Sequence, residues 1–279
     1  MRKIYDVIQW LSLDVTLGAW ASGGMVAWWL QVPMDWTWWV GLPLAVWVVY
    51  TTDHLLDAWR LKAQASTARH LFHYRFRHYL IPLCGVGAIG GMTLAYFLPL
   101  PILLTGGGIA VLVAIHLLLV KLIGDRTSLF FHKEVGVGVI FTCGIWAGPW
   151  TIAPHPHGGI DMLLAVQYFL LVMINLLIFS NYELAIDEKD GHTSFVRALG
   201  QNRTLWIIGG LGGTLILLLV FLLLTANQLE NIWEIQTIYL LMLALLWWIS
   251  FHPQLFGQQE GYRLWGDMVF IFPILHLVL

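Results

Sequence analysis

Charged residues and cysteines are scarce in this sequence. Only 11% of its 279 residues are charged, 59% are hydrophobic, and 16 are tryptophan. A soluble globular domain has about 25% charged residues, so this composition excludes that class and is typical of a protein that lies in lipid. The two cysteines, Cys84 and Cys143, fall inside apolar stretches without metal-ligand spacing. We interpret both as buried apolar residues.

Nine predominantly apolar runs divide the chain. Most approach the ~20 residues that a helix needs to cross the hydrocarbon core, and all are too long for strands of a membrane barrel. The runs cover residues 8–31, 36–58, 79–98, 102–123, 135–153, 161–186, 204–225, 236–252 and 263–279. The sequence therefore predicts an all-α integral membrane protein with nine transmembrane helices, forming a single domain over residues 1–279.

Alternate loops between these runs lack basic residues. With nine crossings, all 14 Lys and Arg residues fall on one side of the membrane, and the opposite loops carry only acids. Basic residues favour the cytoplasmic side. We therefore expect a multi-pass protein of the cytoplasmic (plasma) membrane with a cytoplasmic N-terminus. No cleavage site follows the first run, so we expect it to be a retained helix and not a signal peptide.

Four acidic residues form two pairs with the same spacing. Asp53 and Asp57 end the second run, and Glu183 and Asp187 end the sixth. A spacing of four residues places both side chains of a pair on one face of a helix, and both pairs fall on the cytoplasmic side. Mg²⁺ usually takes one or two carboxylates and completes its shell with phosphate and water. The pairs therefore predict a Mg²⁺ site that binds a phosphorylated substrate.

Each pair has a simpler alternative. The carboxylates could be ordinary helix-terminal charges near water, paired with Arg60 or Lys189. Two matching pairs on one side, at depths where charge is disfavoured, favour a functional site over this alternative.

The residues around the pairs resemble the UbiA superfamily of intramembrane aromatic prenyltransferases, which has nine helices and aspartate-rich motifs after helices two and six. Asp53 and Asp57 match the family's Asn-x-x-x-Asp-x-x-x-Asp, with Val49 in place of its asparagine. The second family motif is Asp-x-x-x-Asp-x-x-x-Gly-x-x-Thr/Ser, followed by a glycine. It is matched in register, with glutamate first, by Glu183, Asp187, Gly191, Ser194 and Gly200. The chain resembles a divergent member.

This resemblance implies a UbiA-like arrangement of helices around a central cavity and a Mg²⁺-dependent enzyme. The enzyme would ionise an isoprenyl diphosphate and transfer the prenyl group to an aromatic or other lipophilic acceptor, within membrane lipid. We expect no nucleic-acid partner. The two acidic pairs would hold the metal and act in catalysis. The residues expected to bind substrate are Arg60, Arg69, Lys133, Lys189, Tyr50, Tyr182 and His54.

Two other functions stay open. A membrane terpene cyclase of the UbiA type would keep the ionisation step and close the prenyl chain on itself. A transporter or other non-catalytic protein would use the acidic pairs for ion binding, although the pairs lie at helix ends and not at mid-membrane on broken helices.

Two further features have alternative interpretations. His70, His73 and His78 crowd the segment between the second and third runs, where they could bind metal, contact diphosphate, or simply pack. Asp14 lies inside the first run, where an acid either has a function or bonds to a neighbouring helix.

Overall fold

The regular structure is helical throughout the described residues. The computed structural model describes residues 2–61, 67–123, 131–154, 158–190 and 193–279, and these ranges contain no strand. Six helices are long and apolar enough to cross a membrane. They are α4 (Ala68–Ala95), α5 (Leu100–Ile123), α6 (Phe131–Ile152), α7 (Gly159–Tyr182), α10 (Gln201–Thr225) and α11 (Ile232–Phe251). The predicted all-α membrane fold is confirmed.

The three remaining apolar runs are also helical. They form α2 (Leu13–Trp29), α3 (Trp36–Leu61), and α13 (Gly261–Met268) continued by the 3₁₀ helix η4 (Val269–Leu277). The count of nine membrane crossings stays a prediction, because these elements are not among the six candidate spans found in the described residues.

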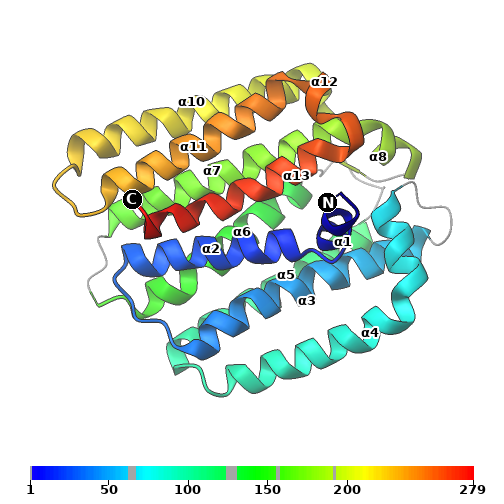
Figure 1. Cartoon of the computed structure of the whole chain (residues 1–279), viewed down its shortest axis with the longest axis horizontal. Helices are drawn as coiled ribbons and strands as arrows, with labels where there is room; N and C mark the ends of the chain where they lie inside the picture. Colours follow the sequence, from blue (N-terminus) through cyan, green and yellow to red (C-terminus); the bar gives the residue numbers. More distant parts are fainter. Residues whose placement is uncertain (1, 62–66, 124–130, 155–157, 191–192) are drawn as a thin grey trace.

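Short helices gather at one end of the molecule. In Figure 1, α1 (Arg2–Trp10), α8 (Leu184–Asp190) and α12 (Pro253–Phe256) lie at the end opposite the C-terminus. The C-terminal ends of α3 and α7 reach the same end; the first acidic pair lies on α3, and the second directly follows α7. Two further short elements, α9 (Phe195–Leu199) and the 3₁₀ helix η3 (Gln258–Glu260), precede α10 and α13. Both acidic pairs therefore lie at the same end of the bundle.

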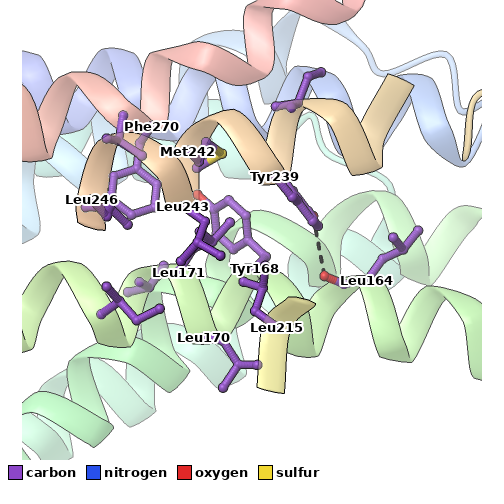
Figure 2. Packing of buried hydrophobic residues seen from close by; sticks show 14 of the residues in the cluster. Leu164, Tyr168, Leu170, Leu171, Leu215, Tyr239, Met242, Leu243, Leu246 and Phe270 are labelled. Carbon is purple, nitrogen blue, oxygen red and sulfur yellow. Dashed lines mark hydrogen bonds between the residues drawn. The ribbon is translucent and has the colours of Figure 1, made fainter. Parts of the chain in front are cut away.

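The hydrophobic core lies between α7, α11 and η4. Tyr168 of α7 packs edge-on against Phe270 of η4, with ring centroids 5.9 Å apart. Tyr239 of α11 donates its hydroxyl hydrogen to the carbonyl oxygen of Leu164 at 3.4 Å (Figure 2). Helices in lipid associate through close packing and such interhelical bonds. This core holds α7 in place, and α7 leads directly into the second acidic pair.

Helices α4 and α5 have the opposite character. Both expose large apolar side chains along their length, including Val86 and Met92 on α4 and Leu104 and Leu118 on α5. Such faces suit the acyl chains of a bilayer, since lipid tails are as apolar as leucine.

The start of α4 differs from the expected loop. The helix begins at Ala68, well before the third apolar run, because the Thr67 side chain accepts the backbone N–H of His70 at 3.2 Å and caps it. No glycine or proline interrupts the sequence before Pro82. The cluster of basic and histidine residues thus lies on a helix, which gives Arg69 and His73 defined positions.

The sixth apolar run also divides. Helix α7 ends at Tyr182, and Glu183 is its C-terminal cap. The backbone N–H of Asp187 nevertheless donates to the carbonyl oxygen of Glu183 at 2.8 Å. The four-residue spacing of the second pair therefore still corresponds to a helical turn.

Candidate active site

A cavity of about 480 Å³ lies among helices from both halves of the chain. Its walls come mainly from α2, α3, α5, α6, α7, α13 and η4. Much of the lining is apolar, with Val46, Val113, Ile140 and Leu176 as examples. A cavity of this size and character suits a hydrocarbon chain.

Charged side chains line the same cavity in balanced numbers. Three are acids and three are bases, so the lining carries no large net charge. The charged lining residues are Asp14, Asp53, Asp267, Arg69, Lys133 and Arg263. The other polar lining residues are Gln9, Ser12, Tyr50, His54, His116 and Asn175. An otherwise apolar cavity with a few convergent polar groups is the usual form of a ligand site.

Helix α3 brings one member of the first acidic pair to this cavity. Asp53 lines it, and Asp57 lies one helical turn further toward the end of α3. The buried ring of His54 places Nδ1 4.0 Å from Oδ2 of Asp53. His54 also meets His73 of α4 edge-on, with ring centroids 5.1 Å apart. The histidines of α3 and α4 therefore pack against each other next to Asp53.

Lys133 connects the two acidic pairs electrostatically. This residue, near the start of α6, lines the cavity, and its charge interacts with those of Asp57, Asp53 and Asp187. Its neighbour Glu134 accepts the backbone N–H of Phe195 at 2.8 Å and so ties α6 to α9. One cation thus lies within electrostatic reach of carboxylates from both pairs.

The second pair has different surroundings at its two members. Glu183 accepts a hydrogen bond from the Tyr262 hydroxyl at 3.0 Å and forms an ion pair with Arg263, both through Oε1. At Asp187, which lies beyond α7, burial raises the pKa to about 6, and the negative charge of Glu183 acts in the same direction. A bound cation would favour the ionised form of Asp187.

The acids do not form a preformed metal cage. Within the described residues, no three His, Cys, Asp or Glu side chains are close enough to hold one metal ion. Mg²⁺ binds through one or two carboxylates and fills its shell with water and phosphate oxygens. Two separate pairs at one end of the bundle fit that requirement, whereas they would not suit a structural metal with four protein ligands.

This chain is similar to known proteins in its fold and not in its sequence. No protein-family model and no curated protein sequence matches the chain. A solved UbiA homologue from Archaeoglobus fulgidus, bound to GPP and Mg²⁺, matches at a TM-score of 0.65 with 11% identity, covering 98% of this chain and 99% of that chain. An apo UbiA homologue from Aeropyrum pernix K1 matches at 0.63 with 14% identity, covering 96% and 99%. The chain has the UbiA fold.

A third solved structure extends the range of proteins with this fold. It is described as that of a digeranylgeranylglyceryl phosphate synthase in membranes, and it matches at a TM-score of 0.58 with 12% identity, covering 99% of this chain and 98% of that chain. Nearly the whole chain is therefore arranged as in the UbiA fold.

The UbiA fold brings some of the predicted substrate residues into the cavity. Tyr50, His54, Arg69 and Lys133 line it. Val49, which stands where the family motif has asparagine, lines it too. The departure from the motif therefore lies in the cavity wall itself.

Other predicted residues lie away from the cavity. Arg60 and Lys189 are exposed at the ends of α3 and α8. Tyr182 donates its hydroxyl hydrogen to the carbonyl oxygen of Ile249 at 2.7 Å and stacks on Tyr262 with centroids 4.4 Å apart. Their contacts with substrate stay predictions. Gly191 of the second motif lies outside the described residues.

Sequence reasoning missed two charged residues of this cavity. Arg263 and Asp267 lie in the last apolar run, on α13, and both are buried. The overlooked sign is their spacing of four residues at the start of an apolar run, which repeats the spacing of the two acidic pairs.

Proposed function

We propose that the protein is a Mg²⁺-dependent intramembrane prenyltransferase. It would ionise an isoprenyl diphosphate and join the prenyl group to a lipophilic acceptor. The observation that carries this proposal is Lys133, which lines an apolar cavity while its charge interacts with Asp53, Asp57 and Asp187. UbiA homologues solved with GPP or DMAPP and Mg²⁺ support the choice of substrate.

The acidic pairs are the proposed metal ligands. Asp53, Asp57, Glu183 and Asp187 would hold Mg²⁺, which supplies positive charge to the diphosphate leaving group when bound. Glu183 would use Oε2, because Oε1 already contacts Tyr262 and Arg263.

Basic residues of the cavity would bind the remaining phosphate oxygens. Lys133 and Arg69 line it and can donate charge-assisted hydrogen bonds to phosphate. Both would stabilise the negative charge that grows as the bond between the prenyl carbon and the phosphate oxygen breaks.

The apolar wall would hold the prenyl chain and exclude water. Tyr50, Phe141 and Phe179 line the cavity, and their ring faces can stabilise an allyl cation. A dry cavity also protects that cation from hydrolysis.

We also propose that the protein lies in the plasma membrane and that the polar end of its cavity faces the cytoplasm. This orientation rests on the basic residues of the loops, which favour the cytoplasmic side.

The proposal is tested by diphosphate release from GPP with purified protein and Mg²⁺. Asp57→Asn and Asp187→Asn should each reduce release on the order of 100-fold, as for loss of a group that stabilises the transition state. Glu188→Gln is the matched control, because Glu188 is exposed on α8 beside Asp187. Unchanged release in both acidic variants would overturn the proposal.

Two further outcomes separate the alternatives. Formation of a hydrocarbon product without acceptor would identify a terpene cyclase. Substrate flux across sealed vesicles without diphosphate release would identify a transporter.

A further inference from the structure

A second set of polar side chains in the cavity has no part in the proposed metal and diphosphate site. Gln9, Ser12 and Asp14, around the junction of α1 and α2, line the cavity together with Asn175 of α7. Their exposed fractions are only 7%, 1%, 4% and 5%. Each has a buried polar atom without a hydrogen-bond partner within the described residues, namely Nε2, Oγ, Oδ2 and Oδ1.

Such atoms are costly when they have no role. A buried polar atom without a partner costs about 1 to 3 kcal/mol, so buried polar groups in proteins are almost always bonded. Four of the unpartnered atoms in the described residues belong to side chains that line this one cavity, where a bound molecule can reach them. The backbone of Ser12 also adopts a left-handed conformation, with φ of 55°, which is unfavourable for a residue with a side chain.

The chemistry of the four atoms defines the ligand. Three of them, on Ser12, Asp14 and Asn175, can accept hydrogen bonds, and Gln9 offers a donor. Asp267, 8% exposed, adds a second buried acidic side chain close to Asp14. An anionic group would meet two carboxylates there, whereas a hydroxyl would find acceptors for its hydrogen.

Other charged groups near Asp14 do not change this conclusion. Arg263 and Arg69 both interact with Asp14. Arg263 is already paired with Glu183. Arg69 also interacts with Glu183 and Asp267, and in the proposed function its guanidinium binds the diphosphate.

Asp53 of the first acidic pair lines the same cavity as the four residues. Tyr50 lines this cavity too, and its hydroxyl lies close enough to Asp14, Asp267 and Asp53 for their charges to act on it. A molecule bound at Asp14 and a diphosphate bound at Asp53 would therefore lie close to one side chain, as two reacting substrates must.

We propose that Gln9, Ser12, Asp14 and Asn175 bind the nucleophilic group of the acceptor, and that this group is a hydroxyl. This inference rests on the proposed prenyltransferase function. The hydroxyl would donate its hydrogen to Oδ2 of Asp14. Once the carbon–oxygen bond to diphosphate has broken, the hydroxyl oxygen forms the bond to the prenyl carbon of the allyl cation. The bonding electrons leave with diphosphate, and the hydroxyl proton passes to Asp14.

The test compares two probes of equal size, naphthylmethanol and naphthoate. Their binding is measured with the purified full chain in nanodiscs containing Mg²⁺ and geranyl thiodiphosphate, a slowly reacting substrate analogue. We expect naphthylmethanol to bind at least about tenfold more tightly, as expected for one hydrogen bond to a charged group. Equal binding, tighter binding of naphthoate, or binding of neither probe would overturn the inference.

Two variants separate this role from a structural one. Asp14→Asn should reduce the preference to less than about threefold, because the amide replaces the charged acceptor. Ser12→Gly removes the hydroxyl acceptor and should also reduce the preference to less than about threefold. The variant should still fold, since glycine tolerates a positive φ. Unchanged preference in both would overturn the inference.

Another buried acid, which lies outside the cavity, provides a matched control. Asp161 of α7 is 0% exposed, accepts the indole N–H of Trp29 at 2.8 Å, and does not line the cavity. Asp161→Asn should leave the preference between the probes unchanged. If the unmodified protein did not bind geranyl thiodiphosphate, that result would contradict the proposed function. A failure of the proposed function can therefore be distinguished from a failure of the proposed acceptor site.

Discussion

The guanidinium of Arg263 on α13 forms an ion pair with the carboxylate of Glu183, at the junction of α7 and α8. Both side chains are largely buried, with exposed fractions of 10% and 16%. Arg263 also lies over the ring of Phe179, 5.3 Å from its centroid. The pair ties the C-terminal part of the chain to the second acidic motif.

Removing one partner of this pair should destabilise the fold strongly. Arg263→Met leaves the Glu183 carboxylate buried without its cation, and we expect a loss of about 3 kcal/mol in the free energy of unfolding. In the double variant Arg263→Met with Glu183→Gln, at least half of that loss should be recovered. The measurement is unfolding of the purified protein in detergent. Additive effects of the two changes would show that the residues do not interact.

The acidic pairs and the helices could be predicted from the sequence because their signals are local. Apolar runs of membrane length mark each long helix, and a spacing of four marks Asp53 with Asp57. The pair of Glu183 with Arg263 joins residues 80 positions apart, and no local pattern indicates it.

Two differences between prediction and structure have a local physical cause. The cap on α4 depends on the Thr67 side chain, whose neighbours read as a polar loop. The break after Tyr182 interrupts an apolar run that continues without glycine or proline. Hydropathy indicates neither the cap nor the break, because neither one changes how apolar its segment is.

Tyr182 and Tyr50 should respond differently to substitution, although the sequence predicts both as substrate contacts. Tyr182→Phe removes the hydrogen bond to Ile249, so we expect a loss of about 1 kcal/mol in stability with kcat and KM for GPP unchanged. Tyr50→Leu removes a ring from the cavity lining and should lower kcat/KM by about tenfold while the protein still folds. A raised KM in Tyr182→Phe would show that Tyr182 contacts substrate.

Alanine substitutions at two adjacent glycines on α10 should have different effects on stability. A Cβ atom on Gly212 would overlap the indole ring of Trp247 on α11, whereas nothing lies within 4 Å of a Cβ atom on Gly213. Gly212→Ala should therefore destabilise the protein by about 2 kcal/mol through overpacking. Gly213→Ala should cause no loss, because alanine is the better helix former. Thermal unfolding of both variants in detergent checks this, and equal stabilities would contradict the close approach of α10 and α11.

Membrane orientation can be tested with single cysteines on opposite ends of the molecule. Glu188 on α8 and Glu230, in the connection between α10 and α11, are both exposed and lie at opposite ends of the bundle (Figure 1). The basic residues of the loops predict that Glu188 faces the cytoplasm and Glu230 the other side. In a background carrying Cys84→Ala and Cys143→Ala, a membrane-impermeant maleimide added to intact cells should label Glu230→Cys. Glu188→Cys should react only after permeabilisation. The reverse pattern would place the polar end of the cavity outside the cell, where it could not draw isoprenyl diphosphates from the cytoplasm.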